Sequence, residues 1–255
     1  MILPTLTKSR AAALRRDLAK LPRLDEKRVA LRQFILESKK LARQRFDLIV
    51  YPLFSGLIPA TLFNDLYARR HRQQPLPMLE YATLSSLSKN GIAKAAGDYG
   101  ITFNAQAEPI LAKIEKDLLI FTKKNQINLS RAQILLIDAN LAQGITVACF
   151  VEVLRRLDYN FKNLTLVITD SRASDPKLPQ APQHLLRGGR LVLFNQANMT
   201  NKVFDNVLTV SAYALDRKNL KTLRRGKVIY HKKQLNFYPY YLSLALFQQE
   251  LASGH

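Results

Sequence analysis

The residues best suited to chemistry in this chain lie between positions 134 and 146. Four apolar residues end on Asp138, and a short polar segment then leads to Gly144 and Thr146. The pattern of residues 147–157 predicts a helix, so a buried strand, a turn and a helix follow one another here. In an open parallel sheet such a junction binds phosphate-bearing ligands, because free backbone N–H groups and the helix dipole point at it.

A second junction of this kind precedes the first. Residues 48–51 predict a strand, residues 52–56 a turn containing Ser55 and Gly56, and residues 57–70 a helix. A serine nucleophile at a strained elbow would require Gly-x-Ser-x-Gly, but Leu53 and Leu57 stand at the two glycine positions. We therefore do not expect a serine hydrolase. A plain strand-to-helix turn and a second group of phosphate-binding amides both remain open.

Together the two junctions resemble the binding site of type I phosphoribosyltransferases. In that family a hydrophobic strand is followed by two acidic residues, a short linker, Thr-Gly, one residue and Thr. Asp138, Gly144 and Thr146 match this pattern, whereas Ala139 replaces the second acidic residue and Gln143 replaces the first threonine. The resemblance implies the α/β fold of this family and a site that has lost part of its chemistry.

The resemblance also implies a role for each matching residue. Asp138 would be the catalytic residue and would hold the ribose hydroxyls, and the two turns would bind the 5′-phosphate and the pyrophosphate. The implied phosphate- and ribose-binding residues are Gln143, Gly144, Ile145, Thr146, Ser55 and Gly56. Magnesium is implied only for an active enzyme, and alanine at position 139 weakens such a site, because hard cations favour charged oxygen donors. No other cofactor or metal is expected.

Charge is the second strong signal. Lys and Arg number 39 against 19 Asp and Glu, a net charge of +20, whereas a magnitude of about 2–8 suffices for solubility. Cations set on a phosphate backbone release condensed counterions, so nucleic acid is the simplest partner. The candidate nucleic-acid contacts are Arg43, Arg45, Arg69, Arg70, Arg72, Arg217, Lys218, Lys221, Arg224, Arg225 and Lys227. These cations could instead form solvated surfaces or stabilise the C-termini of helices. The sequence does not distinguish RNA from DNA.

The remaining pattern predicts the elements that position these residues. Strands are expected around Leu48, Met78, Ile134, Leu164, Leu191 and Val207, with helices between several of them. This order predicts a doubly wound, mainly parallel α/β sheet. Residues 1–45 are expected to form a basic helical extension, with one helix over 25–45. Residues 46–212 are expected to form the phosphoribosyltransferase-like core. Residues 213–255 are expected to form a basic, aromatic segment ending in a helix over 240–251.

Composition narrows the cellular setting. The single Cys149 excludes an internal disulfide. No apolar run reaches the roughly 18–20 residues that a membrane helix requires, and the first residues lack a secretory pattern. A cytoplasmic protein without a membrane partner is therefore expected, and a homo-oligomer is compatible with the sequence.

Two functions of different classes follow. An active enzyme would transfer phosphoribose from phosphoribosyl pyrophosphate to a nitrogenous base. A degenerate scaffold would instead bind nucleic acid and sense a nucleotide or leave its pocket empty. Phosphoribosyltransferase-like proteins also occur in bacterial retron anti-phage systems beside a reverse transcriptase and its RNA–DNA product, and a degenerate motif in a chain of charge +20 is similar in kind. That similarity, together with the charge, favours a partner or effector in a nucleoprotein complex.

Overall fold

The computed structural model describes residues 19, 24–52, 56–81, 93–96, 100–140, 145–170, 188–194 and 238–253. Its helices are α2 (Leu24–Leu41), α3 (Leu57–His71), α5 (Glu108–Lys124), α6 (Ile145–Arg156) and α8 (Tyr238–Ala252). Its strands are β1 (Leu48–Pro52), β2 (Met78–Tyr81), β3 (Ala93–Ala96), β4 (Gly100–Phe103), β5 (Ile134–Asn140), β6 (Leu164–Asp170) and β7 (Arg190–Leu193). Single 3₁₀ turns, Ala105–Ala107 and Phe161–Asn163, precede α5 and β6.

Five of the strands form one sheet in the order β2-β1-β5-β6-β7, and every neighbouring pair is parallel. Val50 pairs with Leu79 on one side and Leu136 on the other, which fixes the register of β2, β1 and β5. The chain leaves β1 for β2 and returns to β5 on the other side of β1. The switch point of this sheet, where ligands bind in open α/β folds, therefore lies between β1 and β5.

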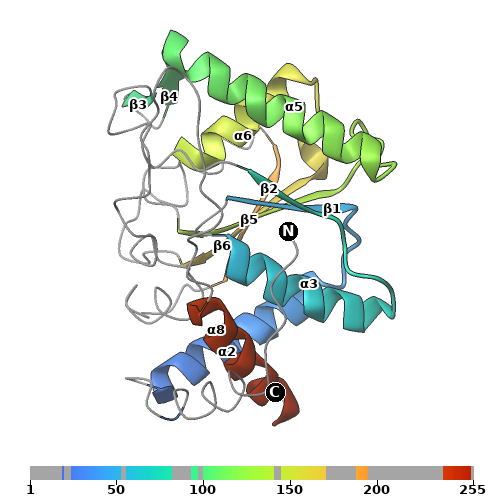
Figure 1. Cartoon of the computed structure of the whole chain (residues 1–255), viewed down its shortest axis with the longest axis vertical. Coiled ribbons are helices and arrows are strands. Elements are labelled where there is room, and N and C mark those ends of the chain that lie inside the picture. Colours follow the sequence, from blue (N-terminus) through green and yellow to red (C-terminus); the bar gives the residue numbers. More distant parts are fainter. Residues whose placement is uncertain are drawn as a thin grey trace.

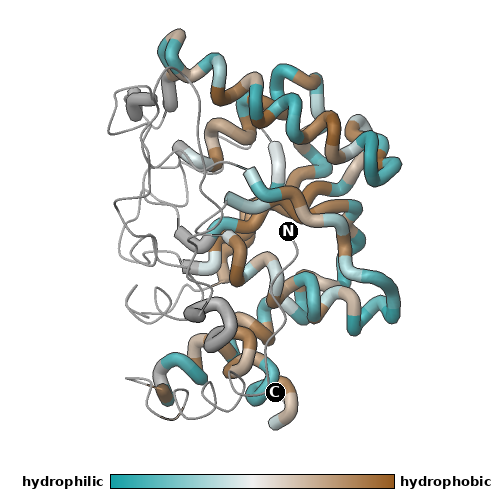
Figure 2. The backbone as a smooth tube through the Cα atoms, in the orientation of Figure 1, coloured by the Kyte–Doolittle hydropathy of each residue, from teal (hydrophilic) through white to brown (hydrophobic). Residues whose placement is uncertain are grey.

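The sheet is buried on both faces, which explains why its strands read as continuous apolar runs. One face packs against α2, α3 and α8, and the other packs against α5 and α6 (Figure 1). Side chains alternate between the two layers along β5, where Leu135 and Ile137 face the first layer and Ile134 and Leu136 face the second. The hydrophobic interior on both sides of the sheet is visible in Figure 2.

The expected α/β fold with a parallel sheet is confirmed, with helices on both faces as a doubly wound arrangement requires. The C-terminal helix is also confirmed. Leu246 and Phe247 of α8 are buried in the same core cluster as residues of α2 and α3. The antiparallel pair β3–β4 was not predicted, because these four-residue strands carry little hydrophobic pattern. The strand expected around Val207 lies outside the described residues.

Helix α2 differs from its prediction in length and packing. It ends at Leu41 instead of continuing to residue 45, because the chain tightens into turns in which Arg43 and Gln44 donate to Lys40 and Leu41. Although it was expected within an N-terminal extension, its buried side, with residues such as Phe34, belongs to the main core. Within the described ranges, no helix combines the length and apolar character needed to cross a bilayer.

Candidate functional site

The turn before α3 lies directly on the end of β5. A β-carbon at Gly56 would stand 2.5 Å from the carbonyl oxygen of Ile137, and only 2.7 and 2.8 Å from side-chain atoms of Tyr51 and Pro52. Real β-carbons do not approach other atoms this closely, so the contact requires glycine. Because Asp138 follows Ile137 in the chain, this contact brings Gly56 and Asp138, predicted from separate motifs, to the same place at the switch point.

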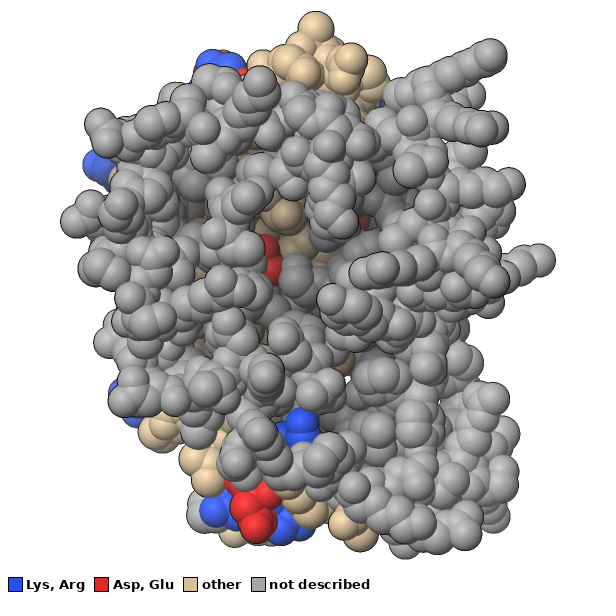
Figure 3. Space-filling view, turned by 90° about the vertical axis from the view of Figure 1, so that its left-hand side faces the viewer, with Lys and Arg blue, Asp and Glu red and all other residues tan. Residues whose placement is uncertain are grey.

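Asp138 is 2% exposed and lies on β5 opposite Ile168 of β6. It alternates with Ile137, which faces α3, so its side chain points to the layer of α5 and α6. Because the carboxylate is buried next to the first turn of a helix, few water molecules compete for it. Such a carboxylate is suited to accept hydrogen bonds from the hydroxyl groups of a ligand. In Figure 3, which faces this edge of the sheet, acidic side-chain atoms are visible near the centre.

Tyr81 is a site residue that the sequence did not single out. It ends β2, is 1% exposed, and its hydroxyl donates to the backbone oxygen of Thr146 at 3.3 Å. Its ring stacks on Phe150 of α6 at a centroid distance of 5.3 Å. Burial raises the pKa of Tyr81 well above 10.0, and the nearby carboxylate of Asp138 raises it further. Tyr81 therefore holds the start of α6 against the end of β2, close to Asp138.

Tyr81 was missed because the sequence predicted a strand around Met78 without determining where that strand ends. The structure ends it at Tyr81, so this residue stands at the carboxyl end of the sheet rather than in the middle of a strand. A tyrosine as the last residue of a parallel strand is the signal that would have identified Tyr81 as a site residue.

Two helices begin at this edge. Helix α3 starts behind Gly56 without a side-chain cap, and α6 starts at Ile145, two residues before the start that the sequence predicted. Neither helix has an acidic residue in its first turn. The first amides of a helix lack intrahelical acceptors, and the dipole favours an anion there. This end of the sheet can therefore bind a phosphate group and, through Asp138, hydroxyl groups attached to it.

Thr169 is a further polar group at the same edge. It stands one residue before the end of β6, is completely buried, and its hydroxyl has no hydrogen-bond partner within the described ranges. Ser55, Gln143 and Gly144 lie outside the described residues. Among the residues that are described, no group of three His, Cys, Asp or Glu side chains could hold a metal ion. The magnesium expected for an active enzyme thus remains a prediction that Asp138 alone supports.

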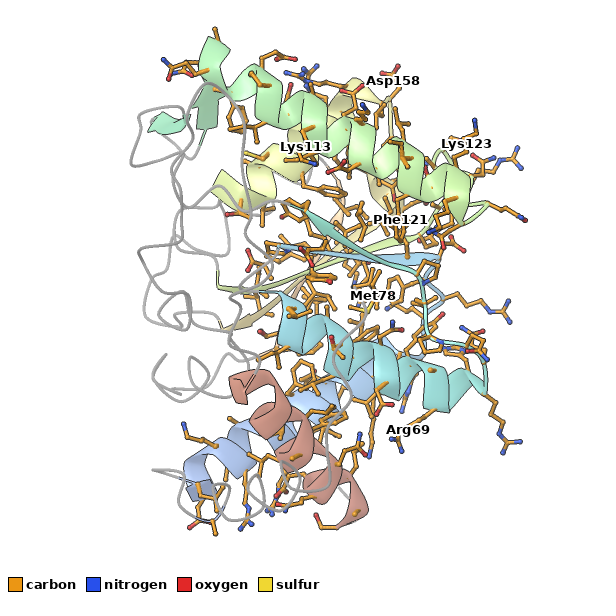
Figure 4. All side chains as sticks on the ribbon, in the orientation of Figure 1. Arg69, Met78, Lys113, Phe121, Lys123 and Asp158 are labelled. Carbon is orange, nitrogen blue, oxygen red and sulfur yellow. The ribbon has the colours of Figure 1, made fainter. Side chains whose placement is uncertain are left out.

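The predicted nucleic-acid contacts lie at the other edge of the sheet. Arg43 and Arg45 belong to the connection that enters β1, and the remaining described residues of the set, Arg69, Arg70 and Arg72, end α3 before β2. All are exposed, and Figure 4 labels Arg69 on the side away from the carboxyl ends of the strands. Arg69 pairs with Asp65 at 2.9 Å.

The structure thus separates the two groups of predicted residues, with the candidate pocket at one edge of the sheet and these arginines at the other. The remaining candidates, Arg217, Lys218, Lys221, Arg224, Arg225 and Lys227, lie outside the described part of the chain. Comparison of the chain with family models, curated proteins and solved structures finds no significant match.

Proposed function

We propose that this protein is phosphoribosyltransferase-like and binds nucleic acid through its basic surface, with a degenerate pocket for a phosphorylated ribose at the switch point. The observation that carries this proposal is the position of Arg43, Arg45, Arg70 and Arg72. These exposed cations lie at the edge opposite Asp138 and form no ion pair with any carboxylate among the described residues. Cations that served only a small anionic ligand would surround the pocket, so these four call for a separate polyanionic partner.

The net charge of +20 supports the same conclusion, because it exceeds what solubility requires. The similarity to retron-associated proteins extends the proposal to a role as a partner or effector in a bacterial nucleoprotein complex with anti-phage activity. In such a complex the pocket would sense a nucleotide, and the basic edge would hold RNA or DNA.

Co-purification provides the direct test. The full chain is purified in low salt and in 1 M salt, and the absorbance ratio at 260 and 280 nm is measured for each sample. We expect nucleic acid to accompany the protein at low salt and to leave at high salt, because phosphate contacts weaken steeply with ionic strength. A protein that is free of nucleic acid at low salt and binds neither labelled RNA nor labelled DNA would rule the proposal out.

The second candidate is an active phosphoribosyltransferase, and the contact between Gly56 and Ile137 favours it. This contact brings Gly56, from the turn after β1, to the residue before Asp138, and transfer from phosphoribosyl pyrophosphate would need such a turn beside the carboxylate. Catalysis would come from positioning and from stabilising a cationic ribosyl transition state. Product formation is measured with phosphoribosyl pyrophosphate, Mg²⁺ and a panel of bases. We expect Asp138→Asn to abolish any turnover, and the absence of turnover in the unmodified chain would reject this candidate.

A further inference from the structure

Exposed cations occur at the entrance to every strand of the parallel sheet. Each connection into a parallel strand lies at the same edge, so these residues are brought together by topology although they are far apart in the sequence. We define the amino-end patch as the nine exposed residues Arg43, Arg45, Arg70, Arg72, Lys123, Lys124, Arg131, Lys162 and Arg190. Figure 4 shows Arg69 and Lys123, from opposite layers, on this same side.

None of the nine cations forms an ion pair with a carboxylate in the part of the chain that the structure describes. Two acidic residues share the edge. The carboxylate of Asp47 accepts a hydrogen bond from the backbone of Gln133 at 2.7 Å, and Asp158 is exposed at the end of α6. The charge of the patch therefore remains strongly positive and available to a partner.

Hydrogen bonds join the connections into one surface. The ring Nε2 of His71, at the end of α3, lies 2.8 Å from the carbonyl oxygen of Ala42. This contact fixes the entrance of β1 beside the entrance of β2. Asp47 then donates its backbone N–H to the carbonyl oxygen of Gln133 at 2.9 Å, which joins the entrance of β1 to that of β5.

The other half of the edge is joined in the same way. The hydroxyl of Tyr159, before β6, donates to the carbonyl oxygen of Ala132 at 2.7 Å. Arg190 opens β7 in register with Thr165 of β6. These contacts connect the entrances of β2, β1, β5 and β6, and the strand pairing places the entrance of β7 beside that of β6, so the cations of the amino-end patch lie along the whole sheet.

The backbone at Arg72 supports a role for its charge. Arg72 caps α3 with a φ of 50° in the left-handed region. Glycine or asparagine is favoured at such a position, because other side chains crowd the backbone there. Gln126 and Asp158 have φ of 56° and 49° after α5 and α6 as well, so what distinguishes Arg72 is the cation that it presents at this exposed corner.

The aromatic residues of this edge are turned inward. Phe46, Tyr67 and Tyr159 are 5%, 2% and 4% exposed, and Phe121 and Phe161 are partly buried against the core. Single strands are bound by stacking bases on exposed rings, whereas a duplex presents its phosphates outward and is held by cations. Among the described residues, this edge therefore offers charge without stacking surfaces.

We propose that the amino-end patch binds the phosphate backbone of duplex nucleic acid across all five strands. Strands spaced about 4.8 Å apart give an edge about 20 Å wide. A duplex carries roughly 12 phosphates over that length, both strands counted, and presents those on its near side to the protein. The inference rests on the proposed function and specifies its nucleic-acid partner. It also places the duplex at the edge opposite Asp138, so that a nucleotide and a duplex bind without competing.

The test measures binding of the full chain to a fluorescein-labelled 20-base-pair duplex and to one of its single strands, by anisotropy over a series of salt concentrations. One double variant, Arg70→Glu with Arg72→Glu, alters one half of the patch. A second, Arg131→Glu with Lys162→Glu, alters the other half. The control is Lys113→Glu with Lys116→Glu, which makes the same charge change at two exposed positions in the middle of α5.

We expect the duplex to bind more tightly than the single strand. Each patch variant should weaken duplex binding at least about tenfold and lower the salt slope by about 2, because two phosphate contacts are lost. The control should stay within about threefold of the unmodified chain. Thermal melting checks that each variant folds. If a patch variant does not fold, the double variant Lys123→Gln with Lys124→Gln is measured in its place.

The outcomes separate this inference from the function on which it rests. If the single strand binds more tightly, or if the patch variants behave like the control, the amino-end patch is not a duplex site, although the protein still binds nucleic acid. If only one half of the patch matters, the continuous footprint is rejected. If the unmodified chain binds neither probe, made as DNA and made as RNA, the proposed function fails as well.

Discussion

Gly56 and Ile137 are packed so closely that a β-carbon on the first would stand 2.5 Å from the carbonyl oxygen of the second. This contact joins the turn after β1 to the end of β5 at the switch point of the sheet. It therefore links the stability of the fold to the geometry of the candidate pocket, because the same backbone atoms serve both.

Gly56→Ala should consequently destabilise the protein and displace the turn. Overpacking of this kind costs about 1–3 kcal/mol, and chemical denaturation measures the change in the free energy of unfolding. The matched control is Gly188→Ala, because Gly188 has a φ of 99° but a β-carbon added there would meet no atom within 4 Å. There only backbone strain of about 1 kcal/mol is expected. Equal losses in the two variants would contradict the steric role of Gly56.

Tyr81→Phe removes the hydroxyl that donates to Thr146 at 3.3 Å. At pH 7 we expect a loss of about 1 kcal/mol in the free energy of unfolding, the net value of one hydrogen bond. Burial raises the pKa of Tyr81 well above 10.0, so the unfolded state loses this proton first as pH rises. The stabilisation is therefore complete below about pH 10 and declines at higher pH.

The variant should accordingly lose stability less steeply than the unmodified chain between about pH 10 and 11. Urea denaturation at several pH values measures both slopes. Parallel slopes would show that Tyr81 does not stay protonated in the folded state.

Glu250 of α8 is 3% exposed and pairs with two arginines of α2, Arg32 at 2.6 Å and Arg28 at 3.3 Å. Glu250→Gln should cost about 2 kcal/mol, because Arg32 loses its counter-charge and Arg28 keeps only the longer pair with exposed Asp25 at 3.7 Å. Glu37→Gln is the control, since Glu37 pairs only with exposed Lys40 and Gln33 among the described residues, and an exposed pair contributes about 0.5 kcal/mol. Thermal or chemical denaturation compares them, and equal losses would mean that the pair does not hold α8 in place.

Arg72→Gly tests whether this residue of the amino-end patch contributes to duplex binding while lowering the stability of the fold. Relief of the left-handed strain should raise the free energy of unfolding by about 1 kcal/mol, while loss of the cation should weaken duplex binding several-fold and lower the salt slope by about 1. Denaturation and anisotropy measure the two effects on the same sample. A variant that is more stable and binds equally well would remove Arg72 from the patch.

Much of the fold could be predicted from the sequence. The strands β1, β5 and β6 and the helices α3 and α6 were expected within a few residues of their observed bounds, because each carries a local apolar pattern with a period that belongs to its element. The alternation of strand and helix then required a parallel sheet, and Asp138 was correctly expected near a strand's carboxyl end, although β5 continues to Asn140.

Elements without such a pattern were not predicted. The short strands β3 and β4 are stabilised by pairing with each other rather than by an apolar face of their own. The exposure of Val29 and Leu36, 51% and 49%, also departs from the helical pattern, because the packing of α8 determines which side of α2 is covered.

The sequence by itself determined the class of fold, the position of Asp138 near the carboxyl end of a strand and of Gly56 at a strand-to-helix turn, and the excess of positive charge. Only the tertiary structure decided that Gly56 touches the residue before Asp138, that Tyr81 supports the start of α6, and that cations from five separate connections form one edge. The physical reason is that propensity and charge belong to residues along the chain, whereas proximity depends on strand order, and strand order is set by how the two helical layers bury the sheet.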